Sequence, residues 1–256
     1  MQAQITGPQS ESEQGYGKIL KYCDKSFDDA FEDLMKSGHL QWKPWVGVDW
    51  KLSERRVLIV GESHYAGKED ADNKEERVKE WSNDYNSSRN VICEVCFEDK
   101  YTKYFFGNLH RAILGADIHG EKRVAFWRHL AFCNFIQRIM TDPKERPSPS
   151  EFHKGWQPFL KLLQLLRPDT VLFVGVTAAK YFDVAMAAIG VEHKIEYDKR
   201  LNRVYPPRFF VANDGVKTEM IAIRHTSQYF SWRTWHDYLL KWMPEDLEFL
   251  RGTISL

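Results

Sequence analysis

Residues 57–65 read VLIVGESHY, and this stretch decides the fold. Four consecutive aliphatic residues indicate a strand buried on both faces, and the glycine with the polar cluster after it indicates that the carboxyl end of the strand opens into a site. Two further aliphatic runs, 171–174 and 220–223, also end in glycine or in polar residues. In an open parallel sheet, ligands bind outside the carboxyl ends of the strands. We therefore expect function at these three strand ends.

Length and periodicity predict one domain. The 256 residues suffice for one sizeable core. Residues 1–14 are polar and aperiodic, so we expect a flexible tail there and a single domain over 15–256. A further buried strand is predicted at 130–135, a stiff proline–serine loop at 143–150, and either irregular structure or a hairpin at 194–211. Amphipathic spacing predicts helices at 74–85, 104–114, 151–167, 178–189 and 232–243. These elements predict an α/β fold, a three-layer α/β/α sandwich around a central, mostly parallel sheet.

Composition narrows the class of protein. The formal net charge is zero, so composition alone does not indicate a nucleic-acid binder, although a local basic patch stays possible. The sequence shows neither a transmembrane run of about 18–20 apolar residues nor a secretory signal, so we expect a cytoplasmic protein with no membrane partner. The four cysteines are few and irregularly spaced, which suits reduced thiols.

The motifs, taken in order, resemble those of the uracil-DNA glycosylase superfamily. A strand runs into Gly61-Glu62-Ser63-His64-Tyr65, a second ends at Asn134, a proline–serine loop and a helix follow, and then come Gly175-Val176-Thr177 and His225-Thr226-Ser227. The match covers roughly residues 55–240. The resemblance implies a uracil-DNA glycosylase-like fold and an enzyme that extrudes a base from DNA and hydrolyses its N-glycosidic bond.

The resemblance also implies catalytic roles. His225 would donate a hydrogen bond to the oxygen of the departing base, where negative charge develops; by spacing alone it would equally well cap the next helix. Glu62 would stabilise the sugar cation or orient water, or would be a structural carboxylate. Ser63 stands where the uracil enzymes carry a water-activating aspartate, so it can position water but cannot act as a base. This difference puts the usual uracil mechanism in doubt.

Three residues would bind the base. Asn134 falls where the family has its base-reading asparagine, and its amide can pair with a pyrimidine edge at two atoms; the alternative is a strand-end cap. Tyr65 would lie against the C5 edge of the base, or would be a packed aromatic. His64 replaces a proline and would add a polar contact, or would lie at the surface.

The remaining expected site residues would contact DNA. Amides and a hydroxyl at Gly175 and Thr177 precede a helix and can meet a phosphate. The 147–150 loop would press another phosphate through Ser148 and Ser150, although Ser150 could instead cap the helix. After His225 the family inserts an apolar wedge into the base stack. The residues expected on this stretch are Ser227, Gln228, Tyr229 and Phe230, with the last two open to a core role.

Cysteine spacing bears on cofactors. One branch of the superfamily carries a four-cysteine iron–sulfur cluster, and Cys93-x-x-Cys96 raises that possibility or a zinc site. Here the pair follows the first motif instead of preceding it, Cys23 is distant in sequence, and Cys133 lies in a predicted buried strand. We expect no cofactor and no metal.

The sequence thus predicts a monomeric DNA glycosylase that leaves an abasic site. Its base would be pyrimidine-type, either uracil, in repair, or a bulky modified cytosine of phage DNA, in antiviral defence. The competing prediction is a non-catalytic module that binds nucleic acid or a modified base on the same fold, because Ser63 replaces an acid. An unrelated hydrolase or nucleotide-binding protein is disfavoured, since the sequence lacks Gly-x-Gly-x-x-Gly and Gly-x-Ser-x-Gly patterns.

Overall fold

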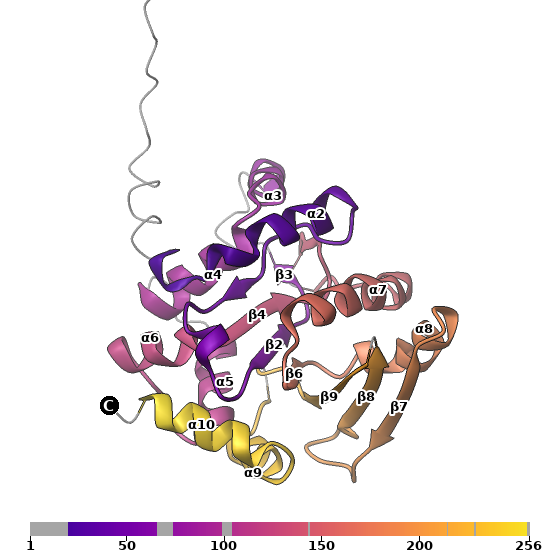
Figure 1. Ribbon diagram of the computed structural model, residues 1–256. Helices are drawn as coiled ribbons and strands as arrows, with labels where there is room; N and C mark the ends of the chain where they lie inside the picture. The colour runs from indigo at the N-terminus through magenta and orange to yellow at the C-terminus, as the bar shows by residue number, and fades with distance from the viewer. Residues whose placement is uncertain are drawn as a thin grey trace, which may run out of the picture.

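A computed structural model describes residues 20–65, 74–98, 104–142, 144–213, 215–227 and 229–254. Within these residues seven strands form one sheet with the order β1-β4-β2-β6-β9-β8-β7 (Figure 1). The strands are β1 (Trp45–Val46), β2 (Val57–Gly61), β4 (Leu130–Asn134), β6 (Thr170–Val174), β7 (Glu192–Tyr197), β8 (Pro207–Asn213) and β9 (Val216–Ile223). The predicted α/β class is confirmed. The expected tail, residues 1–14, lies outside the described residues.

The sheet is mixed. Strands β4, β2, β6 and β9 are parallel, whereas β1 on one side and β8 and β7 on the other pair antiparallel. The four parallel strands are the three aliphatic runs and the further buried strand that the sequence predicts, since strands covered on both faces are apolar throughout. The segment predicted as irregular or as a hairpin is a hairpin, β7–β8. Antiparallel pairs at both edges therefore qualify the expected mostly parallel sheet.

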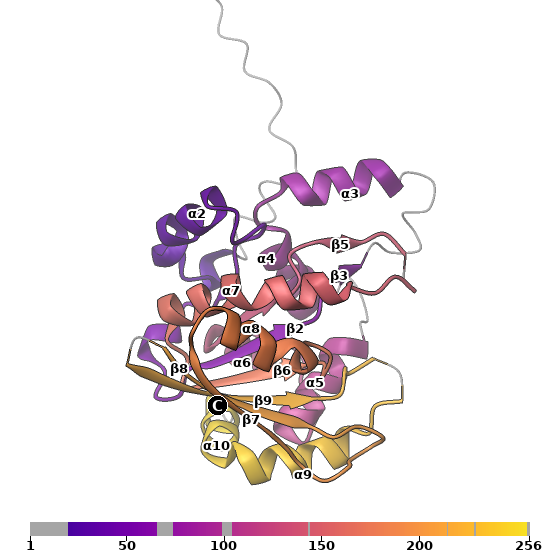
Figure 2. The ribbon, with the colours of Figure 1, turned by 90° about the vertical axis from the view of Figure 1, so that its right-hand side faces the viewer.

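Helices cover both faces of the sheet (Figures 1 and 2). Alternate residues of β2 point to opposite faces, and because all of them are apolar, both faces need a covering layer. Leu58 and Val60 pack in one core with helices α2 (Asp28–Lys36), α7 (Pro149–Leu166), η6 (Ala178–Tyr181) and α8 (Phe182–Ala188). Val57 and Ile59 pack in the other core with α4 (Ser87–Ile92), η5 (Cys93–Phe97), α5 (Tyr104–Leu114), α6 (Gly120–Arg128), α9 (Trp232–Trp242) and α10 (Pro244–Ile254). Each fully buried aliphatic side chain contributes roughly 1.5–3 kcal/mol. These two cores fix the strand ends.

A smaller layer lies beside the site end of β2. Strand β3 (His64–Tyr65) pairs parallel with β5 (Ile139–Met140), and α3 (Lys74–Asn83) packs over them, away from the main sheet (Figure 2). Trp42 and Ile139 form a small core with side chains of α3. The tryptophans that precede β2, Trp42, Trp45 and Trp50, are buried and therefore pack inside the fold.

Candidate functional site

Four neighbouring strands end in one row at the same edge of the sheet. The register places Gly61 of β2 beside Asn134 of β4, and Val60 beside Phe173 of β6. One position further on, Val174 of β6 pairs with Ile223 of β9. The polar residues that follow these positions therefore converge on one edge, as the sequence predicts for parallel strands.

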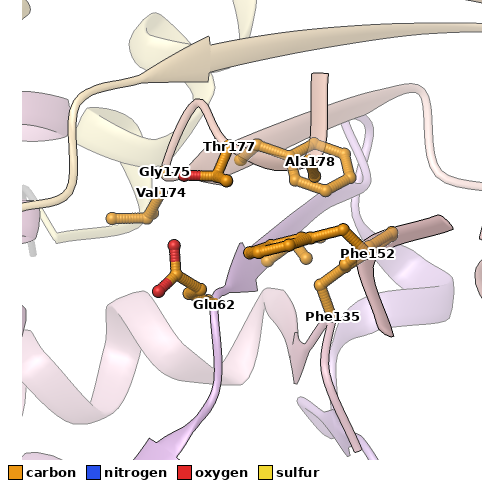
Figure 3. A pocket seen from close by; sticks show the side chains of 10 residues that line it. Glu62, Phe135, Phe152, Val174, Gly175, Thr177 and Ala178 are labelled. Atoms are coloured by element: carbon orange, nitrogen blue, oxygen red, sulfur yellow. The ribbon is translucent and has the colours of Figure 1, made fainter. Parts of the chain in front are cut away.

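Glu62, directly after β2, lines a small pocket. Its carboxylate faces the turn after β6, and phenyl rings of Phe135 and Phe152 close the other side (Figure 3). A cavity volume of ≈ 10 Å³ remains, about what one water molecule needs. Burial raises the pKa of Glu62, while the charge of Arg146 and the hydroxyl of Tyr65 act in the opposite direction. Once ionised, Glu62 is thus a stronger base than an exposed glutamate.

Gly175 shapes the opposite wall of this pocket. Its φ is +146°, a backbone conformation that favours glycine, and a Cβ there would lie 3.6 Å from Glu62 Oε2. Thr177 also lines the pocket. Its side chain does not cap the following 3₁₀ helix η6, and its hydroxyl makes no hydrogen bond with a described residue. That hydroxyl is available to a water or a phosphate.

Asn134 presents an amide beside Gly61. The residue is only 5% exposed, yet its side-chain amide makes no hydrogen bond with any described residue. A Cβ on Gly61 would lie 2.2 Å from Asn134 Oδ1, so the absence of a side chain at position 61 is what makes room for the amide. Buried amides are normally hydrogen-bonded. The Asn134 amide is therefore available to a group outside the chain.

Ser63 has a hydroxyl that is buried and unpartnered among the described residues. The oxygen is thus available to a bound water, although a serine cannot act as a carboxylate base. Neither Ser63, Asn134 nor His225 lines the small pocket, which Glu62 alone of the predicted catalytic residues reaches. Asn134 and His225 lie on either side of it, on β4 and after β9.

His225 is held in one protonation form. The backbone N–H of Ser227 donates to His225 Nδ1 at 3.3 Å, and Ser227 Oγ lies 2.9 Å from the same atom. A backbone amide can only donate, so Nδ1 accepts and the neutral ring carries its proton on Nε2. Burial, with a smaller effect of the Arg146 charge, lowers the pKa of His225 to about 4. At neutral pH the residue is an uncharged N–H donor, and Nε2 has no partner among the described residues.

Helix α5 positions this histidine. The ring of Phe105 lies 5.3 Å from the His225 ring, centroid to centroid. Thr226, which is fully buried, donates through Oγ1 to the Phe105 carbonyl at 2.9 Å, and Asn108 Nδ2 donates to the Thr226 carbonyl at 2.7 Å. The loop after β9 is thereby fixed on a helix far away in sequence, so the imidazole position is set before any ligand arrives.

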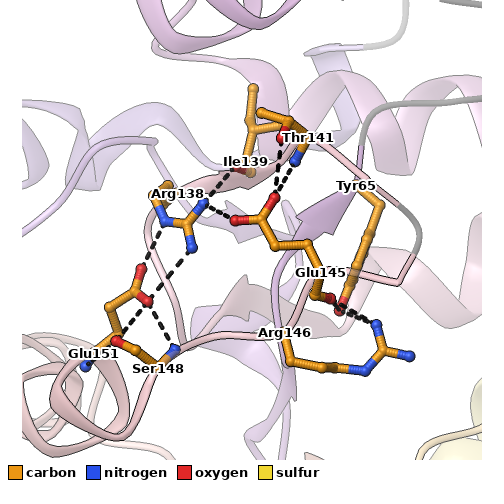
Figure 4. A network of polar contacts seen from close by, with 8 residues as sticks. All are labelled: Tyr65, Arg138, Ile139, Thr141, Glu145, Arg146, Ser148 and Glu151. Carbon is orange, nitrogen blue, oxygen red and sulfur yellow. Dashed lines mark hydrogen bonds and ion pairs between the residues drawn. The ribbon is translucent and has the colours of Figure 1, made fainter. Parts of the chain in front are cut away.

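Arg146, on the proline–serine loop, lies at the site beside Tyr65 and is not among the residues predicted from the sequence. Its Nη1 donates to the Tyr65 hydroxyl at 3.1 Å and to the Glu145 carbonyl at 2.7 Å (Figure 4). The charge of the same guanidinium lowers the pKa values of both Glu62 and His225. Arg146 is exposed, so it offers a cation at the rim of the site.

The loop that carries Arg146 is held in place by Arg138. Arg138 donates from Nη1 to Glu145 and from Nε to Glu151, each at 2.6 Å (Figure 4). Ser148 caps α7 in a capping box with Glu151. The helix cap is thus Ser148, and not Ser150, which lies exposed in the first turn. The hydroxyl of Ser148 is engaged in this structural contact.

His64 lies outside the site, against the expectation that it adds a polar contact to the base. It is 5% exposed, its Nε2 lies 2.9 Å from Ser88 Oγ, and its ring packs edge-on against Trp42 and Trp81. The reason is the alternation of strand residues: in β3, Tyr65 points to Arg146 and His64 points the other way. We therefore leave His64 out of the proposed site.

The loop after His225 separates two aromatic roles. Tyr229 is 81% exposed and has φ +56°, a conformation that non-glycine residues rarely adopt. Phe230 stacks on the buried ring of Trp235 and is therefore a packing residue. Tyr229 is the better candidate for a wedge. Gln228 lies outside the described residues.

The cysteines are buried free thiols. Burial raises the pKa of Cys93 and of Cys133 to about 12, so both are protonated at neutral pH. Among the described residues no group of three or more His, Cys, Asp or Glu side chains could hold a metal ion. No helix in the described part of the chain is long and apolar enough to cross a membrane.

A scan against protein-family models found no match, and a search of curated proteins found none either. The geometry of the strand ends is therefore the basis on which a function can be inferred.

Proposed function

We propose that this protein is a monomeric DNA glycosylase that hydrolyses the bond between a pyrimidine-type base and deoxyribose. The single observation that carries the proposal is the state of His225, a neutral imidazole whose Nε2–H points from a rigid loop and has no described partner. A departing pyrimidine develops negative charge on its ring oxygen. One such N–H donor aimed at that oxygen lowers the barrier by about 3 kcal/mol.

The neighbouring groups supply the rest of the reaction. Asn134 offers a donor and an acceptor to the edge of an extruded base. Glu62, with its raised pKa and a water-sized cavity beside it, orients the attacking water and takes its proton as the bond to the base breaks. Its ionised form also stabilises the positive charge that develops on the sugar. Ser63 follows Glu62 in the sequence, and its buried hydroxyl positions water and transfers no proton.

The size of the pocket sets a condition. A cavity of ≈ 10 Å³ does not hold a nucleobase, so the base either lies at the rim, between Asn134 and His225, or enters after the side chains of Phe135 and Phe152 move. The small volume of this pocket, together with Ser63 in place of an acid, favours the second candidate function, a non-catalytic module that binds nucleic acid through the same edge.

Base release from DNA tests the proposal and separates the two candidates. Purified protein is incubated with duplexes containing uracil, duplexes containing glucosylated hydroxymethylcytosine, and unmodified duplexes, and alkali-labile abasic sites are counted. We expect cleavage of a modified duplex and a loss of about 100-fold in rate for His225→Ala. His193→Ala is the matched control, because His193 lies near the amino end of β7, at the opposite edge of the sheet, and should leave the rate unchanged.

Three results would decide against parts of this proposal. Binding of duplex without base release supports the non-catalytic module. A His225→Ala variant as active as the wild type refutes the assigned mechanism. Cleavage confined to uracil removes the modified-cytosine substrate while keeping the enzyme class.

A further inference from the structure

The turn that joins β7 to β8, residues 198–206, lies at the same edge as the candidate site. Because β8 runs antiparallel to β9, with Arg208 opposite Ile221, the start of β8 lies beside the end of β9. Tyr197, the last residue of β7, pairs with Pro207. Figure 2 shows this turn and the loop after β9 on one side of the sheet.

The turn is tight and carries an arginine in an unfavourable conformation. Leu201 and Val204 exchange two backbone hydrogen bonds, of 2.7 and 3.0 Å. The two residues between them, Asn202 and Arg203, have φ of +44° and +70°. Positive φ at both central positions defines a type I′ turn, in which asparagine followed by glycine is the favoured pair. Arginine in the second position is less favourable than glycine there, because its Cβ crowds the backbone.

Three exposed cations surround this turn: Lys199, Arg200 and Arg203. None of them forms an ion pair with a described residue. Arg208 of the same hairpin differs, because it is bound by Glu196 and Asp198. In a chain with a formal net charge of zero, three cations within five residues, none paired within the described part of the chain, form a local positive surface of the kind that attracts phosphates.

The turn is also attached to the loop that carries His225. Asn202 Nδ2 donates to the Tyr229 carbonyl at 3.3 Å, and Arg224 Nη1 donates to the Asn202 carbonyl at 3.1 Å. Arg224 directly precedes His225. The positions of the cations and of the exposed Tyr229 ring are thus coupled to the position of the imidazole.

We propose that residues 199–203 of this turn, called the clamp below, bind the phosphate backbone of the DNA strand next to the nucleotide at His225. The inference rests on the proposed function for its partner, DNA. It adds the path of the DNA strand, which runs from the site past the carboxyl end of β9 toward the carboxyl end of β7. Lys199, Arg200 and Arg203 neutralise phosphates and read no sequence, while Tyr229 stacks on a base.

The test compares two triple variants with the same change in charge. The clamp variant is Lys199→Ala, Arg200→Ala, Arg203→Gly. The control variant is Lys161→Ala, Arg167→Gly, Lys217→Ala, which removes three exposed cations elsewhere. Arg167 is the matched partner of Arg203, since it is also an exposed arginine with positive φ (+47°) but precedes the amino end of β6. Fluorescence anisotropy with a labelled, unmodified DNA duplex reports binding at several salt concentrations.

We expect the clamp variant to lose affinity by about 10–100-fold at low salt. The slope of log affinity against log salt should fall by about 2–3, near 0.9 for each phosphate that the variant no longer neutralises. The control variant should match the wild type in both quantities. As single substitutions, Arg203→Gly and Arg167→Gly should both keep or raise the melting temperature, and only Arg203→Gly should weaken binding. A loss of affinity in the clamp variant is then not a consequence of unfolding.

Three outcomes would overturn the clamp proposal: the two triple variants lose affinity equally, neither variant loses affinity, or the wild type does not bind the duplex. Base release separates this result from the glycosylase proposal. If the wild type binds through the turn but releases no base, the clamp stands and the glycosylase proposal fails. If the wild type releases base and the clamp variant needs no more protein to reach the same rate, the glycosylase stands and the clamp fails.

Discussion

Buried polar side chains at the two ends of the parallel strands, called the amino edge and the carboxyl edge, differ in their hydrogen bonding. At the amino edge, Asp246 is 1% exposed and accepts hydrogen bonds from Arg55 Nε and Thr170 Oγ1, both at 2.8 Å. At the carboxyl edge, Asn134 is almost as buried, and its amide makes no hydrogen bond within the described residues. The amino edge uses its polar groups for stability, and the carboxyl edge leaves hydrogen-bonding capacity for a ligand.

Substitution of Asp246 should have the largest effect on stability. Asp246→Ala removes the acceptor of Arg55 Nε and Thr170 Oγ1 at a buried position, and we expect a loss of about 3 kcal/mol in the free energy of unfolding. Glu245→Ala is the control, because Glu245 also pairs with Arg55 but its side chain is 77% exposed, and it should change stability by less than about 0.5 kcal/mol. Urea denaturation measures both. A small effect of Asp246→Ala would remove the contrast between the edges.

Asn134→Ala should show the reverse pattern. The amide has no described partner, so we expect the free energy of unfolding to change by less than about 1 kcal/mol. Base release should fall by about 100-fold, since the base loses two hydrogen bonds. Urea denaturation and the abasic-site assay together measure the split. A variant that is strongly destabilised, or fully active, would contradict the assignment of this amide to ligand binding.

Gly61→Ala tests the same amide from the neighbouring strand. The new methyl would collide with Asn134 Oδ1, at 2.2 Å from an ideal Cβ, and we expect the amide to move and base release to fall by about 10-fold. The matched control is Gly252→Ala in α10, where a Cβ meets nothing within 4 Å; it should be fully active and slightly more stable. Equal activity of both variants would show that the position of the amide does not matter.

The last prediction is a pH dependence of stability. The pKa of His225 is lowered to about 4, whereas an unfolded histidine titrates near about 6.5. Between these values the unfolded state binds a proton that the folded state does not, so stability decreases as pH falls from about 6.5 to about 4. His225→Gln lacks this titration and should lose less stability over that window. Urea denaturation at about pH 7 and about pH 5 measures the difference, and equal losses would contradict the lowered pKa.

The sequence predicted the elements with the strongest burial. The four parallel strands are correct because strands covered on both faces leave uninterrupted apolar runs, and their parallel pairing brings Glu62, Asn134 and His225 to one edge. Strand β7 was left undecided, because its residues, EHKIEY, alternate between exposed and half-buried positions and resemble a loop in composition. Edge strands lack the signal that central strands carry.

Residues whose role depends on loop geometry could not be predicted. Arg146 is an exposed arginine in a proline-rich loop, and no local pattern shows that this loop returns to Glu62 and His225. The prediction that His64 contacts the base was wrong for a related reason. Its place in the motif suggested a neighbour of Tyr65 in the site, but adjacent residues of a strand face opposite sides. The resemblance gave positions along the chain, and the side-chain direction came only from the fold.

The bridge that Arg138 forms to Glu145 and Glu151 has a consequence for the affinity of a ligand that contacts Arg146. By binding Glu145 on one side of Arg146 and Glu151 on the other, it fixes the ends of a short segment whose backbone would otherwise lose conformational entropy on association, roughly 1–2 kcal/mol per residue. That loss is incurred once, when the chain folds. Under the proposed function, a nucleic acid arriving at the rim would meet a preset guanidinium, and more of the gross contact energy would be retained as affinity.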